Sequence, residues 1–273
     1  MRTVKEKIAT KGLDIALNYL DQDIEKNLPK LMDWFDKFDV HNSIKPERDA
    51  VRKVALNPES NWYRYILNIW NEIDRDVVKN FFTNFLIYSN VIGNQKRKEL
   101  SKKYDCNIPW AILLDPTSAC NLNCIGCWAS EYGDKLSLDY DTLNRIILQG
   151  KELGTYMYIF TGGEPLVRKN DVIKLCEEHN DCQFLAFTNG TLIDEAFADE
   201  MLRVKNFIPA ISIEGFEEET DARRGEGTFQ AISSAMEILR ERHLPFGASC
   251  CYTSKNTEII SSEAFFDWMV EKG

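Results

Sequence analysis

The stretch "WAILLDPTSACNLNCIGCW" (110–128) joins a short apolar run to three closely spaced cysteines. The run is typical of a buried strand, and Cys120, Cys124 and Cys127 follow it at Cys-x₃-Cys-x₂-Cys spacing. The same spacing would also place three residues on one face of a helix. Pro116, two asparagines and a glycine oppose a helix directly after a strand. We therefore interpret this segment as a loop that wraps three thiolates around a metal centre.

Downstream of the cysteines, short apolar runs alternate with amphipathic stretches. This alternation predicts βαβ units and a parallel sheet. Five such units suit an open doubly wound sheet or a partial barrel, and in both folds the chemistry gathers at the carboxyl ends of the strands. The predicted strands are 110–115, 156–160, 183–187, 207–213 and 246–252.

The first part of the chain lacks this alternation. Segments such as "LPKLMDWFDKF" (28–38) repeat apolar residues at helical spacing, and Gly93 is predicted to cap a helix. We therefore expect an all-helical N-terminal domain at 1–105 and an α/β domain at 106–273. The chain ends on a helix and a glycine where a sixth strand is expected, so the sequence predicts a barrel truncated after its fifth strand and helix.

Charge and composition narrow the functional classes. Residues 110–273 carry 14 Lys/Arg against 27 Asp/Glu, which argues against a nucleic-acid partner. The basic cluster "QKRKELSKK" (95–103) favours a solvated helix face over an anionic partner. The N-terminus does not resemble a signal peptide, and no apolar run is long enough for a membrane span. We expect a cytoplasmic protein whose cysteines are thiols or metal ligands.

The identity of the metal centre follows from counting ligands. A structural zinc site needs a fourth ligand, and His41, His179 and His243 stand isolated in the sequence. Three thiolates suit a four-iron cluster with one iron free to bind a small molecule. The alternative to such a reactive cluster is a non-catalytic iron–sulfur or zinc protein that serves electron transfer or scaffolding.

The remaining cysteines give weaker signals. Cys250 and Cys251 are adjacent on the fifth predicted strand, so their side chains should point to opposite faces. We interpret them as small buried hydrophobes, with a substrate-facing thiol as the alternative. Cys106, Cys176 and Cys182 are predicted to be structural thiols.

The cysteine motif, together with "GGEP" after the second strand, resembles the radical S-adenosylmethionine (SAM) enzymes. The resemblance covers about 110–273 and is closest to peptide-modifying maturases and cofactor-building enzymes. It implies a partial (β/α)₆ barrel, similar to a TIM barrel, and a [4Fe–4S] cluster on Cys120, Cys124 and Cys127 whose free iron binds SAM. It further implies one-electron cleavage of SAM to methionine and a 5′-deoxyadenosyl radical that abstracts hydrogen. The implied partners are an electron donor such as a flavodoxin or ferredoxin, and a peptide or cofactor-precursor substrate.

The resemblance also assigns cofactor-binding residues along the same rim. Glu164 would accept a hydrogen bond from the SAM ammonium, and Ser212 and Glu214 would hold the ribose, where the family usually has Asp. Arg224 would bind the SAM carboxylate, with Arg223 as an alternate. The other implied residues are Gly162, Gly163 and Pro165 of the same motif, and Thr188 and Asn189 of "TNG".

One position departs from the family pattern. The family usually has an aromatic residue just before the third cysteine, near the adenine, whereas this chain has Gly126 there and Trp128 after the cysteine. Trp128 either covers the cluster or belongs to the core.

Overall fold

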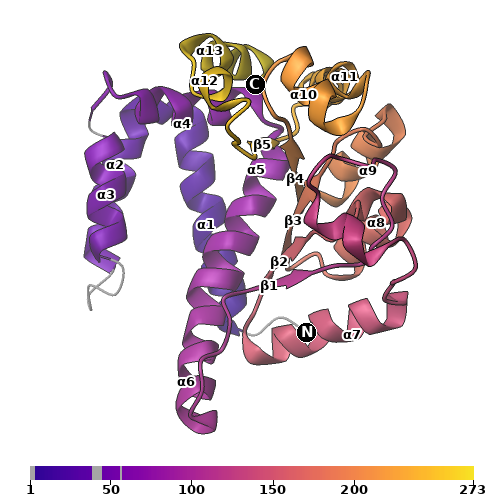
Figure 1. Ribbon diagram of the computed structural model, residues 1–273. Coiled ribbons are helices and arrows are strands. Elements are labelled where there is room, and N and C mark those ends of the chain that lie inside the picture. Colours follow the sequence, from indigo (N-terminus) through magenta and orange to yellow (C-terminus); the bar gives the residue numbers. More distant parts are fainter. Residues whose placement is uncertain (1–3, 39–44, 56) are drawn as a thin grey trace. The chain divides into compact units, whose positions relative to one another are not determined.

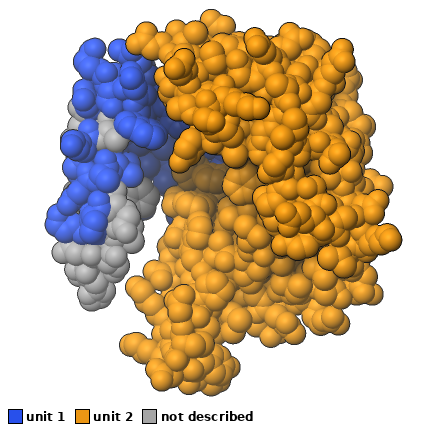
Figure 2. Space-filling view, in the orientation of Figure 1, with its two compact units in different colours: residues 1–79 blue, residues 80–273 orange. Residues whose placement is uncertain are grey.

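The structure, a computed structural model, describes residues 4–38, 45–55 and 57–273. Its Cα positions divide the chain into two compact units, Met1–Lys79 and Asn80–Gly273 (Figure 2). The predicted boundary after residue 105 stays a prediction. None of the helices in the described part combines the length and apolar character that a membrane crossing needs.

The first unit is helical, and its amphipathic faces form a small core. Ala16 and Leu20 pack with Leu28 and Leu31, and Trp70 covers this cluster. The segment predicted to be helical at 28–38 lies within α2, whereas His41 lies outside the described residues. The helices are α1 (Val4–Gln22), α2 (Ile24–Phe38), α3 (Lys45–Ala55), α4 (Asn61–Glu72) and α5 (Arg75–Phe82), the last of which continues into the second unit.

Two further helical segments, η1 (Thr83–Gly93, a π-helix) and α6 (Asn94–Tyr104), precede the sheet. The buried Asn84 side chain donates to the carbonyls of Asn180 (3.1 Å) and Cys182 (2.9 Å), at the start of the third strand. The predicted helix cap at Gly93 is wrong, because its φ is −63° and the helix continues. A Cβ there would lie 2.4 Å from the Gly154 carbonyl oxygen, so this glycine permits close packing instead.

The sheet confirms the predicted α/β class. Five parallel strands lie in the order β1-β2-β3-β4-β5, without the crossover that a doubly wound sheet requires, and sequential order is typical of a barrel (Figure 1). The strands are β1 (Ala111–Leu114), β2 (Met157–Phe160), β3 (Gln183–Thr188), β4 (Phe207–Ser212) and β5 (Gly247–Ser249). The intervening segments are η2 (Trp128–Tyr132), α7 (Tyr140–Leu153), η3 (Pro165–Arg168), α8 (Lys169–Glu178), α9 (Glu195–Val204), α10 (Glu217–Arg224) and α11 (Thr228–Glu241), and α12 (Thr257–Ile260) and α13 (Glu263–Lys272) follow β5.

The two faces of the sheet differ in exposure. Tyr158, Phe160 and Phe184 on one face are fully buried, and the helices α7, α8 and α9 lie on that side of the strands (Figure 1). On the opposite face, Leu113 is 58% exposed and Phe187 is 40% exposed. Helices on one face and exposed apolar side chains on the opposite face are the layered arrangement of a partial barrel with an accessible inner face.

The fifth strand is shorter than predicted. It ends at Ser249, so Cys250 and Cys251 lie in the loop that follows, and both are exposed. The interpretation of these two residues as buried strand positions is therefore wrong. Cys176 and Cys182 are fully buried, as expected for structural thiols, whereas Cys106 is exposed.

Candidate functional site

The three motif cysteines lie in a loop that leaves the carboxyl end of β1 and folds back on itself. The Ser118 amide donates to the Leu136 carbonyl (2.8 Å), and Thr117 bridges to Ser137, which closes the loop at its base. Cys120 is exposed, and Cys124 and Cys127 are half-buried. Desolvation by the surrounding loop raises the pKa of the Cys120 and Cys124 thiols, although the Cys120 residue as a whole is exposed. The thiols are thus accessible to a metal centre and gain from a bound cation that stabilises their thiolate form.

The glycines after β2 bring a second loop against this one. The Gly163 amide donates to the Thr117 carbonyl (2.9 Å), and the Glu164 amide donates to the Ala119 carbonyl (2.8 Å). A Cβ on Gly163 would lie 2.3 Å from the Ala119 oxygen, and Gly162 has a φ of +103°. The glycines therefore permit close approach of the cysteine loop. Pro165 then begins η3 at a first helical position, where its missing N–H is no loss.

Glu164 is 1% exposed and is held by neutral donors from two strand ends. Its carboxylate accepts from the Leu166 amide (2.9 Å), the Thr188 hydroxyl (2.7 Å) and the Asn189 amide (2.7 Å). Burial raises the pKa of Glu164, and these hydrogen bonds oppose that rise. One oxygen accepts two of the bonds and the other accepts one. The second oxygen thus keeps acceptor capacity for a further donor.

Asn189 connects Glu164 to the first cysteine. Its side-chain amide donates to Asn121 Oδ1 (2.8 Å) and lies 3.9 Å from Cys120 Sγ, while its backbone N–H is on Glu164. Asn121 in turn donates to the Thr191 hydroxyl (2.8 Å). Nothing in the sequence marks Asn121 as part of the site, because it is an ordinary loop asparagine between two cysteines.

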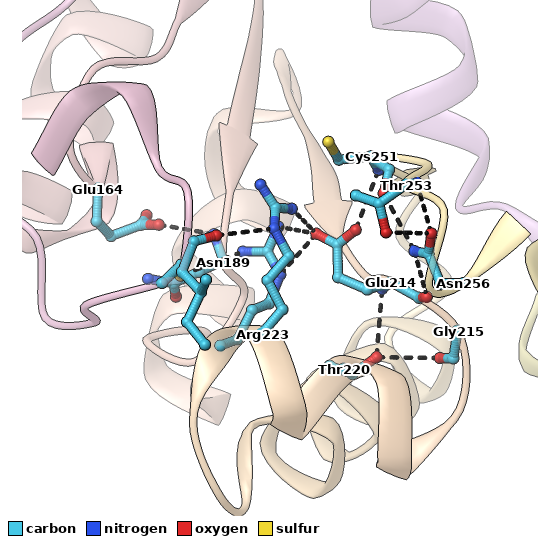
Figure 3. A network of polar contacts seen from close by, with 12 residues as sticks. Glu164, Asn189, Glu214, Gly215, Thr220, Arg223, Cys251, Thr253 and Asn256 are labelled. Carbon is cyan, nitrogen blue, oxygen red and sulfur yellow. Dashed lines mark hydrogen bonds and ion pairs between the residues drawn. The ribbon is translucent and has the colours of Figure 1, made fainter.

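A second buried carboxylate, Glu214, follows β4 and is also 1% exposed. Its Oε1 accepts from Arg223 Nη1 and from Arg224, whose Nε lies at 3.0 Å and Nη2 at 2.5 Å. Its Oε2 accepts from the Cys251 amide (3.2 Å). Figure 3 shows Glu214 at the centre of a polar network that reaches Arg223 on one side and Cys251 on the other.

Two features tie this carboxylate to the other loops. Arg224 Nη1 lies 4.0 Å from Cys124 Sγ, so the guanidinium bridges Glu214 and the cysteine loop. Asn256, 4% exposed, donates to the Glu214 carbonyl (2.9 Å) and to the Cys251 carbonyl (3.1 Å) (Figure 3). Asn256 ends the segment "TSKN" (253–256), and its position after the fifth strand is the only sequence signal for it.

The other residues considered in the sequence lie outside these hydrogen-bond networks. Ser212 ends β4 and is half-buried. Gly126 has a φ of +70° with open space where a side chain would stand. Trp128 is 58% exposed, which excludes the core interpretation, and its ring packs edge-on against Tyr132. His179 is 2% exposed and its Nε2 lies 2.7 Å from Asn144 Oδ1, so it is a buried residue at the end of α8.

Comparison with known proteins identifies the family to which the chain belongs. The family model described as the radical SAM superfamily matches residues 114–254, just over half of the chain. The chain belongs to the radical SAM superfamily. Radical SAM enzymes use a [4Fe–4S] cluster and SAM, and these are the two cofactors predicted from the sequence.

Curated relatives of the chain occur in archaea and bacteria. An uncharacterized protein of Methanocaldococcus jannaschii is 32% identical over 172 residues, covering 59% of each protein. The Fe-coproporphyrin III synthase of Methanosarcina barkeri is 28% identical over 168 residues, 59% of this chain and 41% of that protein. This chain therefore matches only about 40 to 60% of the length of these two relatives.

Solved structures support the partial-barrel fold. The structure of anSMEcpe with bound AdoMet and Cp18Cys peptide has a TM-score of 0.51 and 25% identity, covering 59% of this chain and 48% of that one. Streptococcus suis SuiB bound to precursor peptide SuiA has a TM-score of 0.53 at 20% identity, covering 65% and 40%. The second similarity concerns the fold alone.

The donor set fits a cluster of this kind. Cys120, Cys124 and Cys127 supply three thiols on one loop, with Asn189 and Arg224 as polar neighbours. Within the described residues, no group of three Cys, His, Asp or Glu side chains converges tightly enough for a single metal ion. A cluster does not require that convergence, because each thiolate binds a different iron.

Proposed function

We propose that this chain cleaves SAM reductively on a [4Fe–4S] cluster and uses the resulting radical to abstract hydrogen from a substrate. One observation carries the proposal: the cysteine loop lies between two buried carboxylates, and each is linked to a different cysteine. Asn189 links Glu164 to Cys120, and Arg224 links Glu214 to Cys124. A protein that only carried electrons would have no use for a second and third polar site beside its cluster.

The proposed cluster ligands are Cys120, Cys124 and Cys127. When bound, the cluster supplies the electron for SAM cleavage and SAM supplies the 5′-deoxyadenosyl group that becomes the radical. The protein's part is to bind and orient. Desolvation of the Cys120 and Cys124 thiols favours metal-bound thiolates over free ones, because it penalises an uncompensated charge.

The proposed SAM-binding residues fall into two groups on either side of the loop. Glu164, with spare acceptor capacity and neutral partners, would accept from the SAM ammonium. Thr188 and Asn189 orient that carboxylate through their hydrogen bonds. Gly162, Gly163 and Pro165 shape the loop that carries it. On the other side Arg224 would bind the SAM carboxylate, and Ser212 and Glu214 the ribose hydroxyls.

Product analysis after anaerobic reconstitution tests this function. The expected result is 5′-deoxyadenosine and methionine in equal amounts with dithionite as reductant, and neither product from Cys124→Ala. Reconstituted protein with a full iron content that forms neither product would overturn the proposal.

The substrate is proposed to be a peptide or a cofactor precursor. The support is that anSMEcpe and SuiB have been solved with a peptide bound, and that Fe-coproporphyrin III synthase and PqqA peptide cyclase are among the relatives. A flavodoxin or ferredoxin is the proposed electron donor.

A further inference from the structure

Arg223 has more contacts than an alternate ligand for the SAM carboxylate needs. Its backbone carbonyl accepts from the Ile125 amide (2.8 Å), and its own Nε donates back to the Ile125 carbonyl (3.3 Å). Ile125 lies between Cys124 and Cys127. The two reciprocal bonds therefore attach the middle of the cysteine loop to the last turn of α10.

The same side chain reaches the second buried carboxylate. Arg223 Nη1 forms an ion pair with Glu214, and the Arg223 side chain is only 22% exposed (Figure 3). Glu214 is in turn fixed by the Cys251 amide and by Asn256. The cysteine loop is thus connected through one guanidinium to the loop after β5, without any contact that depends on a cofactor.

The two arginines have different freedom. Arg224 binds the Glu214 carboxylate with Nε and Nη2 and points Nη1 at Cys124 Sγ, and no backbone carbonyl accepts from its side chain in the described structure. Arg223 is held at both ends, by Ile125 and by Glu214. If Arg224 turns to a carboxylate ligand, Arg223 still neutralises Glu214 and still holds the loop.

Charge adds a second consequence. Two guanidiniums share the Glu214 carboxylate, which leaves one positive charge in excess within this group of side chains, on the Cys124 side of the loop. Nearby net charge and hydrogen bonds set the reduction potential of an iron–sulfur cluster. A positive charge at this position favours the more negative, reduced state of the cluster.

We infer that Arg223 is a positioning residue that clamps the cysteine loop to Glu214 before any cofactor binds and raises the reduction potential of the cluster held there. The effect on the loop stands without the proposed function, whereas the effect on potential rests on it. Arg223 thus has two separable roles: a hydrogen bond to Ile125, and a positive charge beside Glu214 and the cluster.

The experiment uses the full chain with Arg223→Gln, Arg223→Lys and, as a matched control, Arg203→Gln. Arg203 makes ion pairs with Glu177 and Glu200 on the exposed outer helices. Hydrogen exchange of the Ile125 amide is measured in the cluster-free protein, and the midpoint potential is measured by spin resonance after reconstitution.

For Arg223→Gln we expect Ile125 exchange about tenfold faster, because the opened loop is more populated. We also expect the ratio of reduced to oxidised cluster at the parent's midpoint potential to fall about tenfold, which corresponds to about 59 mV for a one-electron couple. Arg223→Lys retains the charge and should restore the potential, while Ile125 exchange stays faster than in the parent. Arg203→Gln should change neither.

Two outcomes would overturn the inference. If the Ile125 amide exchanges at the parent's rate in Arg223→Gln, Arg223 does not clamp the loop. If the midpoint potential shifts equally in the Gln and Lys variants, the charge of Arg223 does not set the potential. Failure of the parent to cleave SAM would contradict the proposed function but not the clamp, because the exchange measurement needs neither cluster nor SAM.

Discussion

Glu164 and Glu214 are equally buried, at 1% exposure each, but their partners carry different charge. Glu214 is ion-paired with Arg223 and Arg224, whereas Glu164 accepts its hydrogen bonds from two backbone amides and the Thr188 hydroxyl. A buried anion with neutral partners keeps a desolvation cost that a cation can offset. Glu164 is therefore suited to receive a cationic ligand group, and Glu214 is suited to hold the protein's own cations in place.

The largest expected effect concerns the loop between the two carboxylates. Replacing Cys120, Cys124 or Cys127 singly with Ala should remove most of the bound iron after reconstitution, because two thiolates hold a four-iron cluster poorly. Iron and sulfide analysis measures this. Cys106→Ala, at an exposed position outside the loop, is the matched control and should keep the full iron content. Full iron in all three single variants would contradict the ligand assignment.

The next largest effect is the loss of stability when either buried carboxylate is neutralised in the protein without cofactors. Glu214→Gln should lower the free energy of unfolding by about 3 kcal/mol, because it leaves two largely buried guanidiniums without their counter-ion. Glu164→Gln should cost about 1 kcal/mol, because its lost partners are neutral donors. Urea unfolding of the cluster-free variants at pH 7 measures both values. Equal costs would mean that the charge of the partners is not what distinguishes the two sites.

Much of the fold could be predicted from the sequence, because the strands are short apolar runs bounded by turn residues. The first four strands were predicted to within two residues of their observed ends. The fifth was overextended to residue 252, because "SCCY" continues the apolar run although the strand ends at Ser249. Gly93 was misinterpreted as a cap because its close approach to Gly154 joins residues distant in the sequence.

The site was predictable only as a set of motifs. The spacing of the cysteines and "GGEP" placed Glu164 on the same rim as the thiols, and the hydrogen bonds from Thr188 and Asn189 agree with that placement. The pairing of Glu214 with both arginines could not be predicted, because it depends on how α10 packs after β4. The contact between Arg223 and Ile125 joins residues 98 positions apart.

A smaller effect is expected on the affinity for SAM when Glu164 loses its charge. Glu164→Gln keeps the shape of the side chain but removes the charge that would pair with the SAM ammonium. We expect SAM binding to weaken by about 2 kcal/mol, the scale of a hydrogen bond to a charged group, with the iron content unchanged. Calorimetry on the reconstituted protein measures it. Glu131→Gln, which removes an acidic residue from η2 beside the cysteine loop, is the control and should bind SAM as the parent does.

The smallest effect is the contribution of Glu164 to the pH dependence of stability. Burial raises the pKa of Glu164 above its ordinary value of 4.5, so the folded protein holds this proton at a pH where the unfolded chain has released it. Stability falls with rising pH wherever the folded state binds more protons. The free energy of unfolding of the parent, minus that of Glu164→Gln, should therefore fall as pH rises from about 4.5, by at most about 1.4 kcal/mol per pH unit.

Urea titrations of the cluster-free proteins between about pH 4.5 and 7.5 measure that difference, because Glu164→Gln cannot titrate at this position while every other group is shared. Glu131→Gln should follow the parent, since it leaves Glu164 in place. A difference that rises with pH would mean that the hydrogen bonds from Thr188 and Asn189 outweigh burial. Glu164 would then be stabilised as an anion by the protein alone, and the contrast with Glu214 would no longer explain why a cationic ligand should bind beside one carboxylate and not the other.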